Sequence, residues 1–149
     1  MAVKPIPDGY HSVTPYLVVQ GTAQLIDFLK QAFDAEETER VAAPDGGVMH
    51  AEVRIGGSVI MMADATNEFK PMTSMIHLYV NDADTVYQHA LRAGATSIKE
   101  PKNEFYGDRS ATVKDALGNI WSVATHIEDV PPEELKRRVE AVMKQMPAG

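Results

Sequence analysis

Hydrophobic and polar positions follow the same order twice along the chain, in residues 14–64 and again in residues 75–125. Each passage opens with a short apolar segment that predicts a strand, continues with a helical stretch, and closes with two strands around a glycine-containing turn. Val80 follows Val19 by 61 residues, and the glycines of the two closing turns have the same spacing. Matching offsets at distant positions indicate an internal repeat, in which two similar units together enclose a cavity.

The local signals inside each passage define its elements. Thr22 is a plausible N-cap for the first helix, and the Pro-Asp-Gly-Gly segment at 44–47 is typical of a hairpin turn. After residue 126 the pattern changes, and an acidic first turn precedes an apolar stripe at helical spacing. We therefore expect a helix outside the repeat, packed on the domain or on a second subunit.

These elements predict an α+β fold. Two βαβββ repeats form cupped mixed sheets with helices outside, and a C-terminal helix follows. The whole chain, residues 1–149, forms a single domain, with unit one at 13–64, unit two at 74–127 and the C-terminal helix at 131–146.

Composition narrows the functional classes. The chain of 149 residues has no cysteine, which excludes thiolate catalysis, cysteine-based zinc sites and disulfides, and which fits a cytoplasmic protein. No apolar run is long enough to predict a membrane partner. The net charge of −7 argues against nucleic acid as a partner, because neutralising phosphates requires clustered lysine and arginine.

Alternation along the third strand separates an apolar face from a polar one. The odd-numbered positions from 49 to 55 are all apolar and belong under the helix. His50, Glu52 and Arg54 then lie on the opposite face, toward the cup between the sheets or toward solvent. Trp121 has the opposite parity from Ser122, so we expect its indole on the helix side.

Two segments of the second unit carry a family resemblance. Residues 115–122 (Asp-Ala-Leu-Gly-Asn-Ile-Trp-Ser) and residues 105–110 (Phe-Tyr-Gly-Asp-Arg-Ser), within two units of this length, resemble the vicinal oxygen chelate superfamily. That superfamily includes glyoxalase I, extradiol dioxygenases, fosfomycin resistance proteins and bleomycin-binding proteins. The nearest likeness is to the PhnB-like type, and it covers roughly residues 12–127. A fold shared this widely hosts many chemistries.

The resemblance also implies where a metal would bind. Metal enzymes of the superfamily take one ligand, His or Glu, from the first strand and one from the last strand of each unit. Those positions hold Thr14, Met61, Met75 and Ser122 here. None is a usual ligand for a hard or borderline divalent ion, so we expect no metal there and no cofactor. The two methionines would line an apolar pocket, with Cu(I) binding as the alternative.

Three polar residues are candidates for acid–base chemistry. His77 could act as a general base or donate a hydrogen bond to a ligand, or it could be a satisfied histidine of the strand core. His50 and Glu52 share a strand face, and with His77 they would form a two-histidine, one-carboxylate set. The alternative for His50 and Glu52 is a solvated strand face.

The residues expected to contact a ligand lie on strands and turns of both units. Tyr16 could stack on a ligand or only pack, and Arg109 could clamp a carboxylate or form an ion pair within its turn. The full set of expected contacts is Tyr16, Met61, Met75, Tyr106, Arg109 and Ser122.

The sequence thus favours a homodimeric protein that binds a small organic ligand without the usual divalent metal. The alternative is a glyoxalase-like lyase or isomerase that uses a non-standard metal set, His50, Glu52 and His77, or metal-free acid–base work by His77 and Glu52. A third possibility is a structural or regulatory dimer whose cavity is filled by side chains.

Overall fold

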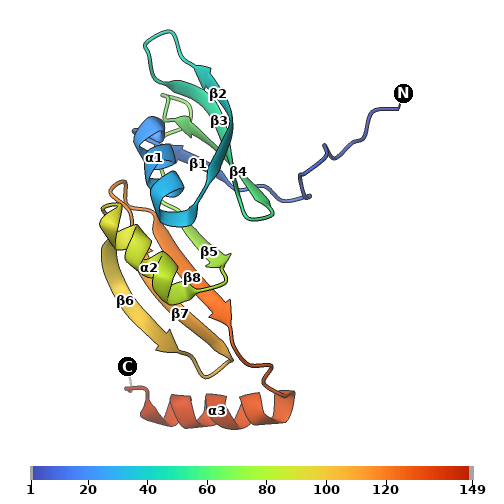
Figure 1. The fold of residues 1–149 in the computed structure, drawn as a ribbon, viewed down its shortest axis with the longest axis vertical. Coiled ribbons are helices and arrows are strands. Elements are labelled where there is room, and N and C mark those ends of the chain that lie inside the picture. The colour runs from blue at the N-terminus through green and yellow to red at the C-terminus, as the bar shows by residue number, and fades with distance from the viewer. Residues whose placement is uncertain (1, 148–149) are drawn as a thin grey trace.

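Residues 2–147 form eight strands and three helices in a computed structural model of the chain (Figure 1). Unit one contains β1 (Tyr16–Val19), α1 (Thr22–Phe33), β2 (Glu36–Ala42), β3 (Val48–Ile55) and β4 (Ser58–Asp64). Unit two contains β5 (Met75–Tyr79), α2 (Ala83–Arg92), β6 (Thr96–Asn103), β7 (Asp108–Lys114) and β8 (Ile120–His126). The last helix is α3 (Pro132–Gln145).

The strands form two mixed sheets of identical topology. Their orders are β1-β4-β3-β2 and β5-β8-β7-β6, and in each sheet the first strand pairs in parallel with the last while the other pairs are antiparallel. The α+β fold with two βαβββ units is confirmed.

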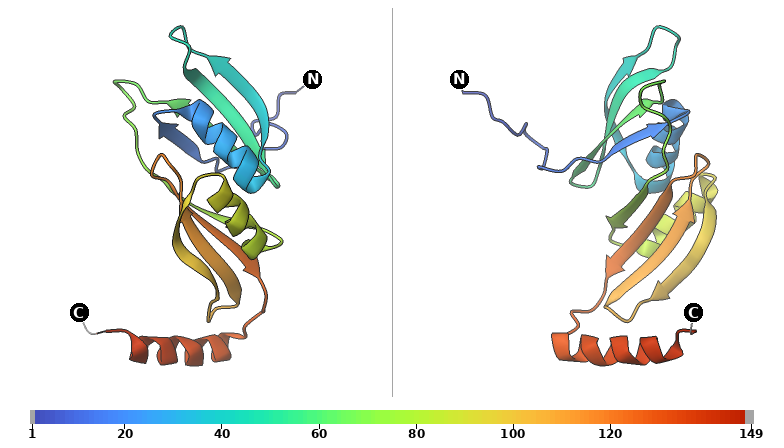
Figure 2. Two further views of the ribbon diagram at one scale, coloured as in Figure 1. Left: turned by 60° about the vertical axis from the view of Figure 1, so that its left-hand side comes forward. Right: turned by 180° about the vertical axis from the view of Figure 1, so that it is seen from behind.

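The helices α1 and α2 each cover one face of the sheet in their own unit, and they contact each other where the units join (Figure 2). Leu25 and Leu29 of α1 are buried in a core that also includes Ala90 of α2. Phe33 at the end of α1 packs on the fully buried Trp121 of β8, with ring centroids 5.1 Å apart. Trp121 therefore lies on the helix side, as its parity predicted, and the two units share one core. The opposite face of each sheet carries no helix among the described residues.

The cap of α1 differs from the sequence prediction. The N-cap residue is Gly21, in a left-handed conformation with φ of 111° that a side chain would disfavour. Thr22 is already helical, and its backbone N–H donates to the carboxylate of Asp64 at 2.8 Å. At the equivalent place in unit two, the N–H of Ala83 donates to the hydroxyl of Thr125, also at 2.8 Å. The end of the last strand of each unit thus caps the helix of that unit.

The helix α3 lies across the end of unit two, remote from unit one (Figure 2), and buries none of its residues. Arg138 holds it there by two hydrogen bonds of 2.8 Å to Glu128 and one of 3.1 Å to the carbonyl of Phe105. Across residues 2–147, no helix has the length and apolar character required to cross a bilayer.

Candidate functional site

Strand pairing lines up one row of side chains across the helix-free face of unit one. Tyr16 of β1 lies opposite Met61 of β4, Met61 lies opposite Glu52 of β3, and Glu52 lies opposite Glu39 of β2. Directly paired residues project to the same side of a sheet, so the four side chains are neighbours. We call these residues the unit-one row.

The same register produces a different row in unit two. His77 lies opposite Ser122, Ser122 opposite Thr112, and Thr112 opposite Lys99. The Nδ1 atom of His77 is 2.9 Å from the hydroxyl oxygen of Ser122. This unit-two row therefore has a lysine where unit one has Glu39, and a threonine where unit one has Glu52.

Hydrogen bonds surround the nearly buried carboxylate of Glu52. One of its oxygens accepts from the hydroxyl of Tyr10, in the N-terminal arm, and the other lies 2.8 Å from Nε2 of His50. The remaining ring nitrogen of His50, Nδ1, is 3.0 Å from the hydroxyl of Tyr16. Burial raises the pKa of Glu52, but the hydrogen bonds from Tyr10 and His50 outweigh that effect and hold it below its ordinary value. The bond to Glu52 in turn raises the pKa of Tyr10.

A cavity of about 680 Å³ adjoins the unit-one row, on the side of the β2–β3 hairpin and the linker between the units. Most of its wall is apolar. It is lined by Tyr16, Val18, Ala43, Asp45, Val48, Met49, Ala63, Asp64, Ala65, Thr66, Phe69 and Met72. Tyr16 therefore both lines the cavity and contacts His50.

The structure brings some of the predicted site residues together and separates others. His50 and Glu52 are in contact, but His77 lies on the other sheet beside Ser122. Thr14, the position expected from the sequence, lies before β1 begins. The residue opposite Met61 is Tyr16.

The remaining predicted contacts lie in unit two, outside the cavity. Met75 lies opposite Ile120 and is exposed, as is Tyr106. Arg109 donates to both carboxylate oxygens of Asp84, at 2.7 and 3.0 Å. This ion pair connects β7 to α2.

A second polar network closes the far end of unit two. The buried carboxylate of Asp108 accepts from the hydroxyl of Tyr79 at 2.7 Å and lies 2.8 Å from Nδ1 of His126. The other nitrogen of His126 is 2.7 Å from Asp129, and the bonds to Asp129 and Asp108 raise the pKa of His126. This network secures the segment that leads into α3.

Sequence reasoning missed several residues in and around unit one. Tyr10 lies in a proline- and glycine-punctuated arm, and Phe69 and Met72 lie in the linker, where no periodicity assigns a partner. Glu39 lies on β2, but its partner depends on the register with β3. The exposed aromatic and methionine side chains of the linker were the available signal, because large apolar residues outside regular elements mark contact surfaces.

Comparisons with known proteins agree on the family. Residues 9–123 match the model of the Glyoxalase/Bleomycin resistance protein/Dioxygenase superfamily. Uncharacterized protein Mb0911c of Mycobacterium bovis is 38% identical over 136 residues, which cover 84% of this chain and 90% of the relative.

Two solved structures share the fold. TioX of Micromonospora sp. ML1 has 20% identity and a TM-score of 0.64, over 78% of this chain and 100% of its own. The PhnB protein of Bacillus cereus, a putative 3-demethylubiquinone-9 3-methyltransferase, has 17% identity and a TM-score of 0.59, over 77% of this chain and 99% of its own.

Proposed function

Because the chain belongs to the Glyoxalase/Bleomycin resistance protein/Dioxygenase superfamily, we propose that it binds a small organic molecule in the cavity of unit one. The observation that carries the proposal is the cavity itself, whose volume of about 680 Å³ and mainly apolar wall are typical of small-molecule sites. Its few polar lining residues include Asp45 and Asp64.

The metal used by the superfamily's enzymes does not fit the side chains at its expected positions. Across the first and last strands, Tyr16 lies opposite Met61 in unit one and His77 lies opposite Ser122 in unit two, so Thr14 and Met75, which were expected there from the sequence, do not face these residues. Only one of these four residues is an imidazole, and its Nδ1 already faces the Ser122 hydroxyl. A thioether and hydroxyl groups are poor ligands for a divalent ion. The proposed binding therefore uses no metal at these positions.

The chemistry of the wall favours a ligand with an aromatic or otherwise apolar body. Met49, Phe69 and Met72 are all more than half exposed, so a ligand that covers them removes apolar surface from water. Methionine and aromatic side chains adapt well to flat rings. The cavity lining includes two carboxylates and no lysine or arginine, which favours a neutral or cationic ligand over an anionic one.

We also propose that two copies associate through their helix-free sheet faces. Met75 and Tyr79 lie on the exposed face of the edge strand β5, and their side chains are 67% and 65% exposed, so together they form an exposed apolar patch. A second copy would cover them. Sedimentation velocity of the chain and of Met75→Asp tests this, with a dimer expected for the former and a shift to monomer for the latter. A monomer at micromolar concentration for the unsubstituted chain would contradict the association.

The binding proposal is tested by screening neutral and cationic aromatic fragments for thermal stabilisation, because a ligand of the folded state raises its stability by mass action. Met49→Ala and Phe69→Ala should weaken any hit at least severalfold. Met143→Ala is the matched control, since Met143 on α3 is 65% exposed against 56% for Met49 but lies outside the cavity. Hits that respond equally to Met49→Ala and Met143→Ala, or a library without hits, would refute the proposal.

A further inference from the structure

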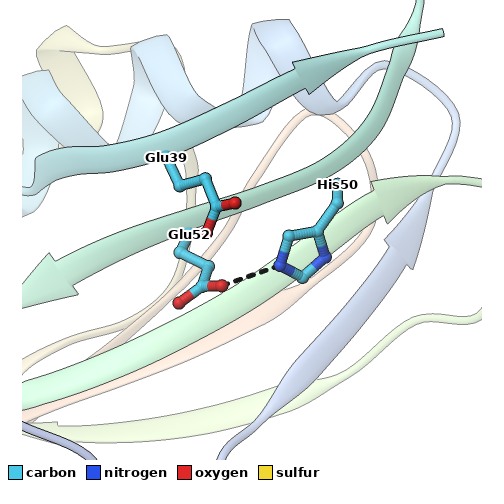
Figure 3. A group of neighbouring side chains, drawn as sticks. All are labelled: Glu39, His50 and Glu52. Atoms are coloured by element: carbon cyan, nitrogen blue, oxygen red, sulfur yellow. Dashed lines mark hydrogen bonds and ion pairs between the residues drawn. The ribbon is translucent and has the colours of Figure 1, made fainter. Parts of the chain in front are cut away.

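Three potential metal ligands converge at the edge of the unit-one row, away from the positions that the superfamily's enzymes use. One atom each from Glu39, His50 and Glu52 lies within 4.8 Å of the others (Figure 3). The residues come from the adjacent strands β2 and β3, and their side chains point toward one another on the helix-free face. Glu52 is only 5% exposed, whereas Glu39 is open to solvent.

Two irregularities in strand pairing create this convergence. The register between β2 and β3 shifts between Val41 and Ala42 and shifts back between Glu37 and Glu39. Only between these shifts does Glu39 lie opposite Glu52. β-Bulges commonly re-aim side chains next to functional sites.

The resulting arrangement places two carboxylates side by side. Two carboxylates that face each other across a strand pair repel. Within residues 2–147, neither Glu39 nor Glu52 forms an ion pair with a lysine or arginine, and His50 is the one basic side chain at ion-pair distance from Glu52. In unit two the residue equivalent to Glu39 is Lys99, so the fold itself does not require an acidic residue there.

Outer hydrogen bonds orient two of the three side chains. Tyr16 contacts Nδ1 of His50, which aims Nε2 at the carboxylates, and Tyr10 holds the oxygen of Glu52 that faces away from His50. Metal-binding histidines and carboxylates characteristically have partners of this kind, which fix the ring orientation and the free oxygen.

We propose that Glu39, His50 and Glu52 bind a divalent transition-metal ion of the zinc type, through Nε2 of His50 and one oxygen of each carboxylate. Zinc–ligand bonds of about 2.0–2.2 Å place ligand atoms about 3–4 Å apart. The 2.8 Å between His50 and Glu52 therefore has to open slightly, and Glu39, on the exposed edge strand, can move inward. One imidazole with two carboxylates suits zinc, whereas Mg²⁺ and Ca²⁺ prefer oxygen ligands alone. This site is separate from the cavity proposal and stands without it.

Titration calorimetry of the untagged, metal-stripped chain with Zn²⁺ tests the site, and we expect one ion per chain. Glu39→Gln should weaken binding at least tenfold, because it removes a charged ligand while leaving shape intact. Glu36→Gln is the matched control on the same strand, since Glu36 lies opposite Arg54 and outside the cluster. Circular dichroism confirms that each variant folds.

The ligating atom is read independently by nitrogen-15 NMR of the histidine rings, where Zn²⁺ should shift Nε2 of His50 among the five histidines of the chain. The proposal is overturned by the absence of saturable binding, by equal affinity of the Glu39→Gln and Glu36→Gln variants, or by shifts confined to other histidines. Equal competition by Mg²⁺ or Ca²⁺ would also overturn it, because it would reveal a general acidic patch.

Discussion

Replacing Asp64 with alanine should destabilise unit one through the start of its helix. The Asp64 carboxylate accepts hydrogen bonds from the backbone N–H of Thr22, at the first turn of α1, and from that of Val48, at the start of β3. It thereby joins the helix, the β2–β3 hairpin and the last strand at one point. Alanine leaves both donors without this acceptor.

The magnitude follows from those two bonds. A hydrogen bond to a charged group contributes about 1.5–3 kcal/mol, and a negative charge at a helix N-terminus adds about 0.3–1 kcal/mol. Because Asp64 is partly exposed, water replaces some of the lost bonding. We therefore expect Asp64→Ala to lower the free energy of unfolding by about 2–4 kcal/mol near neutral pH, and Asp64→Asn, which keeps an acceptor, to lower it by about half as much.

The loss should also depend on pH. Burial raises the pKa of Asp64, but the backbone donors of Thr22 and Val48 outweigh it and lower the pKa below its ordinary value of 3.8. The carboxylate's contribution is complete above the unfolded pKa and disappears as the pH falls through the lower folded pKa.

Urea unfolding of the unsubstituted chain and of Asp64→Ala between about pH 7 and pH 3 measures how much the Asp64 carboxylate contributes to stability. Thr125→Val is the control, because Thr125 caps α2 with a neutral hydroxyl and its loss should not change with acid. A difference between Asp64→Ala and the unsubstituted chain below about 1 kcal/mol near pH 7, or one that does not shrink in acid, would refute the reasoning.

Three further predictions concern unit two and the last helix. Asp115→Ala should cost about 3 kcal/mol in urea unfolding, because it leaves a buried indole N–H and two backbone N–H groups without their acceptor. Arg138→Ala should speed amide exchange throughout α3 while changing global stability by less than about 1 kcal/mol, since α3 buries no residue. The unsubstituted chain should lose stability in urea unfolding as the pH rises above about 6.5, and His126→Gln should abolish this loss. Bonds to Asp129 and Asp108 raise the pKa of His126, so its contribution is present below the unfolded pKa and is lost as the pH rises through the folded one.

The fold could be predicted because the repeat constrains it twice. A spacing of 61 residues that holds for both the opening and the closing strands leaves little freedom for different pairing in the two units, and both sheets have the same order. The prediction of Thr22 as the N-cap of α1 was wrong for a physical reason. Thr22 has the right side chain for an N-cap, but Asp64 reaches the helix start from 42 residues away, and local sequence carries no sign of such a contact.

For the site, the alternation of side chains along a strand predicted which residues share a face, but not which residues pair across strands. Alternation placed His50 and Glu52 on one face, and they are in contact. The position of Glu39 depends on register, because an unbroken pairing continued from Ala42 and Val48 would set Thr38 opposite Glu52. The bulges bring Glu39 instead of Thr38 opposite Glu52. Whether a bulge forms depends on packing across the sheet, and the sequence of one strand does not determine that packing.

The two units also explain why membership in this superfamily leaves the chemistry of the chain open. At the two rows the strands of both units pair in the same way, so the rows differ in the side chains that they present. At one end of the rows Glu39 corresponds to Lys99, which reverses the charge, and at the next position Glu52 corresponds to Thr112. We therefore expect a cation to favour this place in unit one over the same place in unit two. Each unit therefore presents its own ligand-binding chemistry, because the repeat duplicates the backbone scaffold but not the charges of its side chains.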